Sequence, residues 1–235
     1  MTRTYRLLAL TAGLSTPSST RMLTDQLTRE SAAALGRDGA EVEVTTVELR
    51  EYAHDITDTL LTRFPSERLA RVIEHVRAAD AIIAVAPVFN VGPSGLFKTF
   101  FDAVDMELWK GKPVLLGATA GTARHSLAID YAIRPMFGYL KAEVAPTVVF
   151  AASADFGADT EGQADQQPLT VRVRRAAAEL AVMLRAGLGE VAPETADADY
   201  GSDASNAVAG RSSSAPMLDP EFADFVPMGT LLGRD

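Results

Sequence analysis

The chain has 235 residues, of which 47% are hydrophobic and 23% charged, as expected of a globular protein with a sizeable core. It contains no cysteine, which excludes disulfides, thiolate catalysis, iron–sulfur clusters and cysteine zinc sites. The net charge of −9 disfavours nucleic acid as a partner. No run reaches the roughly 20 apolar residues of a membrane helix, so we expect a cytoplasmic protein that does not enter a membrane.

Five short apolar runs alternate with longer helical patterns along the chain. The runs that predict strands are Tyr5–Leu10, Val42–Val47, Ala81–Ala86, Pro113–Ala118 and Thr147–Ala151. The patterns that predict helices are Thr20–Leu35, Glu67–Ala79, Gly95–Val104, Arg124–Leu140 and Leu169–Leu184. This alternation predicts an α/β fold with a parallel sheet covered by helices on both faces. Five strands favour the doubly wound, flavodoxin-like order 2-1-3-4-5, in which ligands bind at the loops after the first and third strands.

The loop after the first strand, residues 12–21, has the sequence AGLSTPSSTR and leads into a helix. Five hydroxyl side chains surround one proline, whereas the N-cap of a helix needs only one such residue. The unpaired amides and partial positive charge of a helix N-terminus, together with these hydroxyls, favour a bound phosphomonoester. The loop has neither a Gly-Lys-Ser nor a Gly-x-Gly-x-x-Gly motif, which argues against triphosphate chemistry and against a pyrophosphate cofactor as the firmly held ligand.

Two further loops are expected at the same edge of the sheet. Residues 87–98, PVFNVGPSGLFK, follow the third strand and offer an aromatic and an amide that can flank a planar heterocycle. Gly92 and Gly95 would let the backbone approach such a ring. Residues 118–125, ATAGTARH, follow the fourth strand, and we expect His125 to contact the ring or a nucleotide. Each loop alone is consistent with an ordinary turn, but together they predict a flat slot that ends in a phosphate site.

The fourth helical pattern contains an irregular step. Pro135 has no amide hydrogen, so the carbonyl of Tyr131 loses its helical partner. A polar aromatic at an interrupted helical turn predicts a π-bulge, a feature that is common at functional sites. The alternative is an ordinary core tyrosine beside a proline kink. Trp109, which follows the preceding helix, is expected to pack in the core or in an interface.

The alternation of strands and helices ends near Leu184, so we assign residues 1–186 to one domain. Residues 187–215 are rich in Ala, Ser, Asp and Gly without periodicity and predict a flexible acidic linker. Residues 216–235 contain eight large apolar side chains. They predict an irregular docking segment that binds this domain, a sister subunit or another protein.

Taken together, these motifs resemble the NAD(P)H-dependent FMN reductases, a flavodoxin-like family. More narrowly, the chain is similar to the reductases that supply reduced flavin to two-component, luciferase-like flavin monooxygenases. The resemblance extends from Leu7 to about Leu184. It rests on Ser15-x-Pro17-Ser18, residues 87–101, residues 111–113 (GKP), Thr119-x-Gly121-Thr122 with His125, and residues 128–135 (AIDYAIRP).

The resemblance implies an NAD(P)H:FMN oxidoreductase, in which hydride passes from NADPH or NADH to N5 of FMN. The cofactors then perform the chemistry, and no catalytic side chain is needed. The resemblance implies that the FMN phosphate lies on Ser15, Ser18, Ser19 and Thr20. It implies that the isoalloxazine lies along Pro87, Val88, Phe89, Asn90, Thr119, Ala120 and Gly121. Asn90 departs from the basic residue that is often found in the monooxygenase-linked members.

The resemblance also implies a tyrosine bulge at a subunit interface, and therefore a homodimer or homotetramer. It further implies a flavin-dependent monooxygenase as a partner. Arg21, Arg124 and Arg134 are candidates to bind the phosphates of the nicotinamide nucleotide. Three alternatives stay open: a quinone or azo-dye reductase, a flavodoxin-like electron carrier, and an interaction protein with a vestigial flavin slot. The sequence does not decide between NADPH and NADH.

Overall fold

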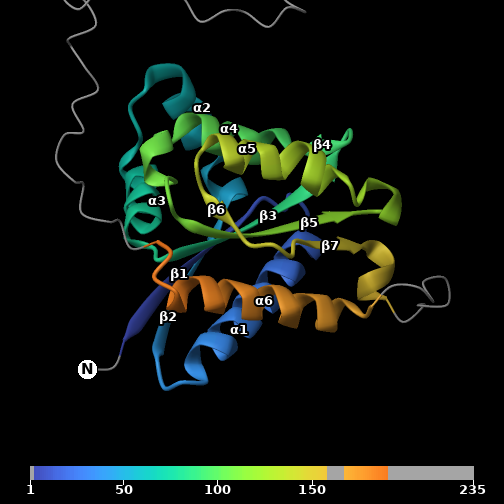
Figure 1. The fold of residues 1–235 in the computed structure, drawn as a ribbon. Helices are drawn as coiled ribbons and strands as arrows, with labels where there is room; N and C mark the ends of the chain where they lie inside the picture. The colour runs from blue at the N-terminus through green and yellow to red at the C-terminus, as the bar shows by residue number, and fades with distance from the viewer. Residues whose placement is uncertain (1–2, 158–166, 190–235) are drawn as a thin grey trace, which may run out of the picture. The chain divides into compact units, whose positions relative to one another are not determined.

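A parallel sheet runs through the middle of the fold, with helices on both of its faces (Figure 1). The structure, a computed structural model, describes residues 3–157 and 167–189, which belong to the unit Met1–Val191. The predicted linker and docking segment lie outside the described residues, apart from residues 187–189. None of the described helices is both long and apolar enough to cross a membrane.

The five predicted strands are all present, each within a few residues of its expected position. They are β1 (Thr4–Thr11), β2 (Glu41–Glu48), β3 (Ala81–Phe89), β5 (Pro113–Ala120) and β7 (Val149–Ala152). Every neighbouring pair among them is parallel, and they lie side by side as β2-β1-β3-β5-β7. The doubly wound, flavodoxin-like order 2-1-3-4-5 is therefore confirmed.

Two very short strands were not predicted. β6 (Glu143–Val144) pairs with the beginning of β5, while β7 pairs with its end, so the outer position of the sheet is shared by two segments. β4 (Gly92–Pro93) turns back antiparallel onto the end of β3. Two-residue strands have no hydrophobic alternation to detect, which is why the sequence did not indicate them.

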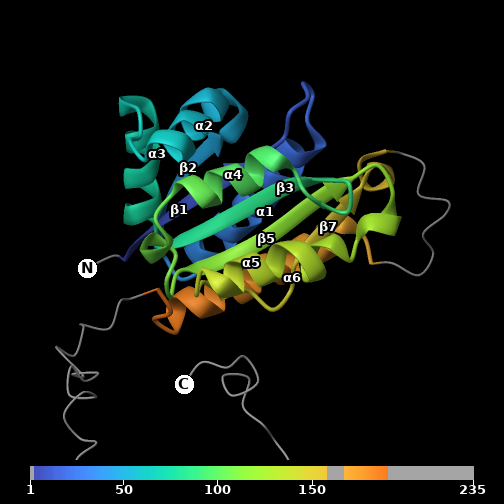
Figure 2. The same cartoon turned by 90° about the horizontal axis from the view of Figure 1, so that it is seen from above.

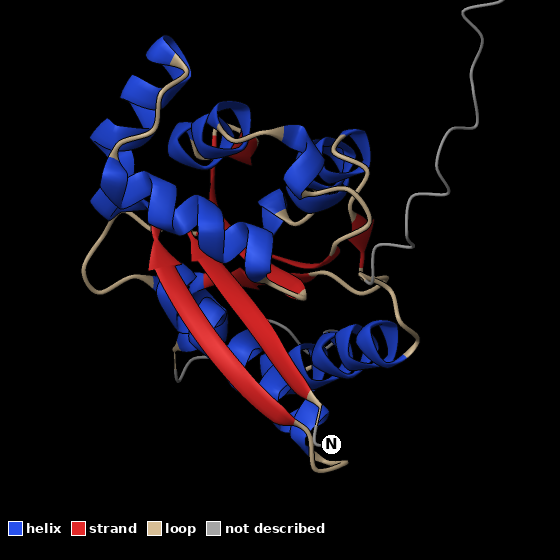
Figure 3. Cartoon of the chain, turned by 90° about the vertical axis from the view of Figure 1, so that its left-hand side faces the viewer, coloured by secondary structure: helices blue, strands red, loops and turns tan. Residues whose placement is uncertain are grey.

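Two helices cover one face of the sheet and four cover the other (Figures 1 and 3). The pair is α1 (Ser19–Gly36) and α6 (Leu169–Arg185). The four are α2 (Ala53–Thr62), α3 (Glu67–Ala78), α4 (Gly95–Ala103) and α5 (Arg134–Tyr139). The helix α2 is not among the predicted helices. It buries only Ile56 and Thr59, too few positions to give a helical pattern in the sequence.

The single helix predicted over residues 124–140 is divided into three pieces. A 3₁₀ turn covers Ala123–His125, a π-helical turn covers Ile129–Ile133, and α5 follows directly. The π-bulge predicted from Pro135 is therefore confirmed. Tyr131 is 79% exposed, so it is not an ordinary core tyrosine.

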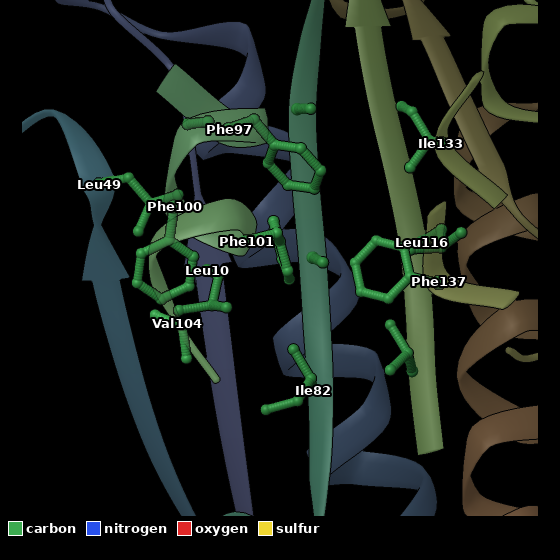
Figure 4. Close-up of a cluster of buried hydrophobic side chains, with 14 of the residues drawn as sticks. Leu10, Leu49, Ile82, Phe97, Phe100, Phe101, Val104, Leu116, Ile133 and Phe137 are labelled. Carbon is green, nitrogen blue, oxygen red and sulfur yellow. The ribbon is translucent and has the colours of Figure 1, made fainter. Parts of the chain in front are cut away.

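The two faces of the sheet are packed with different side chains. Under α4 and α5, aromatic rings interlock: the centroids of Phe97 and Phe101 are 4.7 Å apart, and those of Phe101 and Phe137 4.9 Å (Figure 4). Trp109 is fully buried in the same cluster, as expected for a packing residue. On the opposite face, α1 buries leucines together with the hydroxyl residues Thr20, Thr24, Thr28 and Ser31.

Candidate active site

The parallel strands β3, β5 and β7 run in the same direction and end toward one edge of the sheet (Figure 2). A pocket of about 290 Å³ is lined by residues at this edge. Segments at the ends of β1, β3, β5 and β7 converge there. The lining residues are Leu14, Ser15, Ser19, Thr20, Pro87, Val88, Phe89, Thr119, Ala120, Gly121 and Ser153. The three loops singled out in the sequence thus share one pocket. Of the expected site residues, Ser18, Asn90 and His125 are not part of its lining.

The loop after β1 turns tightly, and a glycine makes this turn possible. A Cβ atom on Gly13 would lie 2.1 Å from Ser18 Oγ and 3.1 Å from Thr20 Cβ. Ser18 is the N-cap of α1, and its Oγ accepts a hydrogen bond from the Arg21 backbone N–H at 3.2 Å. The Ser18 hydroxyl hydrogen stays available as a donor. The absence of a side chain at Gly13 therefore allows the cap and the loop to pack together.

The remaining hydroxyls of this loop have different surroundings. Thr20 is only 2% exposed, and its Oγ1 lies 2.8 Å from Oγ1 of Thr119, so the pair joins α1 to β5. Thr16 Oγ1 accepts a hydrogen bond from Arg50. Ser15 and Ser19 line the pocket, and their hydroxyls have no partner within the described part of the chain. These two hydroxyls can therefore donate to a ligand.

A chain of charged side chains connects the loop to the end of β2. Arg50, in the 3₁₀ turn Leu49–Tyr52, donates from Nη1 to Thr16 Oγ1 at 2.6 Å and to the Ser15 carbonyl at 3.2 Å. Its Nε lies 2.8 Å from Glu48 Oε2. Nη1 of Arg21 donates to the other Glu48 oxygen at 2.6 Å. Both cations are thus held by one carboxylate beside the loop.

The candidate cations for nicotinamide nucleotide phosphates are differently placed. Nε of Arg21 also donates to Asp25 at 2.8 Å, and this hydrogen bond raises the pKa of Arg21 despite partial burial. Arg134 is engaged by Asp130 and by the backbone carbonyls of residues 145 and 146. Arg124 is exposed, three residues after the pocket residue Gly121. Of the three, Arg124 therefore has the most accessible side chain next to the pocket.

The segment after β3 forms a hairpin rather than an open turn. Asn90 and Val91 connect β3 to β4 with φ values of 50° and 69°, the positive values of a type I′ turn. Asparagine tolerates this region, but a β-branched valine rarely adopts it. Phe89 is 47% and Val91 68% exposed. The hairpin therefore places apolar side chains at the rim of the pocket, on a strained backbone.

The end of β5 forms one wall of the pocket, and its packing changes along the strand. Thr119 is 2% exposed, whereas a Cβ on Gly121 would meet no atom within 4 Å. Further back on the same strand, a Cβ on Gly117 would lie 3.0 Å from Leu27 and 3.1 Å from Val85. The pocket wall is therefore supported by close packing, while its outer end at Gly121 is open.

Three residues that shape this site were not among the predicted site residues: Leu14, which lies in the first loop, Ser153 and Arg50. Ser153 lines the pocket directly after β7, and a hydroxyl at the end of a parallel strand could have indicated it. Arg50 contacts the first loop from a segment 34 residues later in the chain. No local pattern points from Arg50 to that loop, so only the fold brings them together.

A larger groove, of about 690 Å³, lies elsewhere on the surface. It is lined by Arg63, Lys98, Phe101, Asp102, Ala103, Val104, Asp105, Met106, Met136, Tyr139 and Leu140. It shares no residue with the pocket at the strand ends and contains no hydroxyl side chain from serine or threonine. Its cations are Arg63 and Lys98, and Lys98 donates to Asp102 at 2.6 Å, so the groove does not combine free hydroxyls with a helix N-terminus as the strand-end pocket does.

Comparisons with known proteins agree on the class of protein that this chain resembles. The family profile described as NADPH-dependent FMN reductase matches residues 5–157. The chain is similar to an FMN reductase (NADPH) of Pseudomonas aeruginosa, with 33% identity over 191 residues that cover 81% of this chain and 98% of the relative. It is also similar to the NADH-dependent FMN reductase SfnF of Pseudomonas fluorescens, with 33% identity over 177 residues that cover 75% and 90%. Among solved structures, an oxidoreductase from Corynebacterium diphtheriae matches with a TM-score of 0.72 and 39% identity, covering 79% of this chain and 99% of that one.

Proposed function

Because the chain belongs to the NADPH-dependent FMN reductase family, we propose that its FMN binds in the pocket at the ends of β1, β3, β5 and β7. The protein is an NAD(P)H-dependent FMN reductase, with FMN and a nicotinamide nucleotide as its cofactors. One observation supports the proposed location above all. Every residue that lines the pocket, from Leu14 to Ser153, lies within the matched range 5–157.

The residues of the pocket fit a phosphorylated planar ring. Ser15 and Ser19 offer free hydroxyls beside the N-terminus of α1, whose unpaired amides and partial positive charge favour a phosphomonoester. Ser18 can add its hydroxyl hydrogen to this set. Toward Gly121, small residues and an unobstructed backbone leave room for a flat ring. The pocket therefore has a polar end for the phosphate and a smooth end for the isoalloxazine.

Bound FMN and a nicotinamide nucleotide would themselves supply the hydride-transfer chemistry. None of the described lining residues carries an acidic, basic or thiol side chain. The chain's own contribution is to anchor the phosphate, to hold the two rings in contact and to limit water at the reacting atoms. Phe89 and Val91 at the rim are placed to border the second nucleotide.

We also propose that the reduced FMN is passed to a separate flavin-dependent monooxygenase. The outer end of the pocket is open at Gly121, which suits a flavin that must leave after reduction. The proposed subunit interface of a homodimer or homotetramer includes the π-helical turn Ile129–Ile133 and Leu127 just before it. Leu127 is 61% and Tyr131 79% exposed, and the Tyr131 N–H bonds to the Leu127 carbonyl at 3.0 Å. Large exposed apolar side chains in one segment favour such a contact. Light scattering at micromolar concentration should give the mass of an oligomer, and the mass of a monomer would contradict this interface.

The decisive experiment for the proposed function measures oxidation of NADPH and of NADH by the purified protein. FMN, riboflavin, a quinone and an azo dye serve in turn as acceptors. We expect rapid oxidation with FMN and slower oxidation with the other acceptors in the absence of FMN. Faster turnover with the quinone or the dye alone would favour the alternative reductase, and no oxidation with any acceptor would favour an electron carrier. A monooxygenase partner is tested separately, by adding the reductase to a flavin-dependent monooxygenase and measuring its product.

A further inference from the structure

Within the described part of the chain, Arg50 is the cation from outside residues 12–21, hereafter the phosphate loop, whose side chain contacts this loop. Its Nη1 donates to the Thr16 hydroxyl at 2.6 Å and to the Ser15 carbonyl at 3.2 Å. The same guanidinium is anchored through Nε to Glu48 Oε2 at 2.8 Å. The anchor is firm because Glu48 ends β2, in register with Thr11 at the end of β1. Arg50 therefore connects the loop to the rigid edge of the sheet.

We propose that Arg50 is a positioning residue of the phosphate loop and that, held by Glu48, it determines the preference of the pocket for FMN over riboflavin. This inference rests on the proposed FMN site and adds a residue that does not line it. Arg50 fixes the backbone at Ser15, whose free hydroxyl lines the pocket. Riboflavin lacks the phosphate, so its binding does not depend on how that hydroxyl is held.

The guanidinium geometry explains why this position requires arginine. Arginine carries five N–H donors in a planar fork, so it can bind a carboxylate with one edge and two loop oxygens with another. Lysine has a single point charge on a flexible stem and cannot reproduce this arrangement. Hydrogen bonds that involve a charged donor are also stronger than neutral ones. The loop conformation is therefore set before a ligand arrives.

The surrounding charges support the same role. Asp25, Arg21, Glu48 and Arg50 form a row of alternating charge whose formal sum is zero. Arg50 ends this row on the side of the loop, and its side chain is 32% exposed. Arg50 is therefore half shielded from solvent, so water competes less for its hydrogen bonds to the loop.

The test compares the dissociation constants of FMN and riboflavin by fluorescence titration for the full chain and for Arg50→Ala and Arg50→Lys. We expect Arg50→Ala to weaken FMN binding about tenfold or more, because the loss of one hydrogen bond to a charged group corresponds to at least a tenfold change in affinity. Riboflavin binding should not change. Arg50→Lys should recover only part of the loss. Glu48→Gln should weaken FMN binding in the same direction, by a smaller factor.

Arg6→Ala is the matched control. Arg6 pairs with Glu43 at 3.4 Å on the same two strands, toward the opposite end from the loop, and both side chains are exposed. Its removal should change neither affinity. Circular dichroism tests whether each variant folds. If Arg50→Ala does not fold, the FMN and riboflavin affinities of Arg50→Lys still test the proposal.

Three results with the Arg50 variants would overturn the inference. An Arg50→Ala variant with both affinities unchanged shows that Arg50 does not set the preference. A variant in which both affinities fall equally shows that Arg50 acts only on the stability of the fold. An Arg50→Lys variant with the full preference shows that charge alone suffices. If the unaltered chain binds both flavins equally, the proposed phosphate site itself is wrong, and the inference fails with it.

Discussion

The loop after β1 and the hairpin after β3 border the same pocket, but they are held in place by opposite means. The loop is fixed by contacts: close packing at Gly13, a helix cap at Ser18 and the arginine anchor at Arg50. The hairpin is short, with positive φ at Asn90 and Val91 and with its apolar side chains exposed. One end of the pocket is therefore preorganised, and the other is strained and open.

This difference separates two tasks that a flavin reductase must combine. A preorganised phosphate end lets binding energy go into affinity instead of into ordering the loop. An open ring end leaves space for the nicotinamide and for release of reduced flavin. Changes in the loop should therefore affect FMN affinity, whereas changes in the hairpin should affect stability or turnover.

The largest effect is expected from Gly13→Ala. The new methyl group would lie 2.1 Å from Ser18 Oγ, so the loop or the start of α1 must move. We expect FMN affinity to fall by orders of magnitude and stability to fall by about 1–3 kcal/mol, as for overpacked positions. Gly36→Ala, at the end of the same helix and with no atom within 4 Å of its Cβ position, is the control and should cost nothing. Normal FMN titration of Gly13→Ala would show that the loop is not preorganised.

The double variant Ser15→Ala, Ser19→Ala tests the free hydroxyls directly. Each hydrogen bond to a charged group is worth about 1.5–3 kcal/mol, so FMN affinity should fall by roughly a hundredfold or more. Riboflavin affinity should not change. A change of the same size for both flavins would place the phosphate elsewhere.

The hydroxyl pair between α1 and β5 should contribute to stability, because Thr20 and Thr119 are each 2% exposed. Either single change to valine leaves one buried hydroxyl without a partner, which costs about 1–3 kcal/mol. The double change removes both hydroxyls and should cost less than the sum of the single changes. Urea denaturation of all four proteins measures this coupling. Strictly additive costs would mean that the two hydroxyls do not interact.

The smallest effect is expected in the hairpin. Val91→Gly removes a side chain from a position with φ of 69°, which should relieve about 1–2 kcal/mol of backbone strain. The greater freedom of glycine in the unfolded chain costs about 0.5–1 kcal/mol. We expect a net gain in stability of about 0.5 kcal/mol. The same change at Val44, which lies in β2 and is 43% exposed, should instead destabilise the protein. Equal losses at both sites would remove the evidence for strain in the hairpin.

Much of the fold was predictable because its signals are local. Apolar runs of strand length and glycines or prolines at their ends mark the five strands, and their alternation with helices restricts the sheet to few orders. The π-helical turn followed from one missing amide hydrogen at Pro135, a covalent property of the residue. The first loop was identifiable because five hydroxyls in ten residues exceed what a helix cap requires.

Other features were decided only by the tertiary structure. The helix α2 and the strands β4 and β6 are too short or too weakly patterned to be recognised without their neighbours. The sequence alone also treats the five loop hydroxyls as equivalent, although the fold assigns them different roles. Thr20 meets Thr119 across 99 residues, and Thr16 meets Arg50 across 34.

The sequence by itself therefore determined the sheet, the position of the pocket at its edge and the residue types around it. Which hydroxyls remain free for a ligand was decided by the fold, since a side chain's hydrogen bonds depend on partners that only the fold brings within reach. The same reason explains why Arg50 could not be found by inspection of the chain.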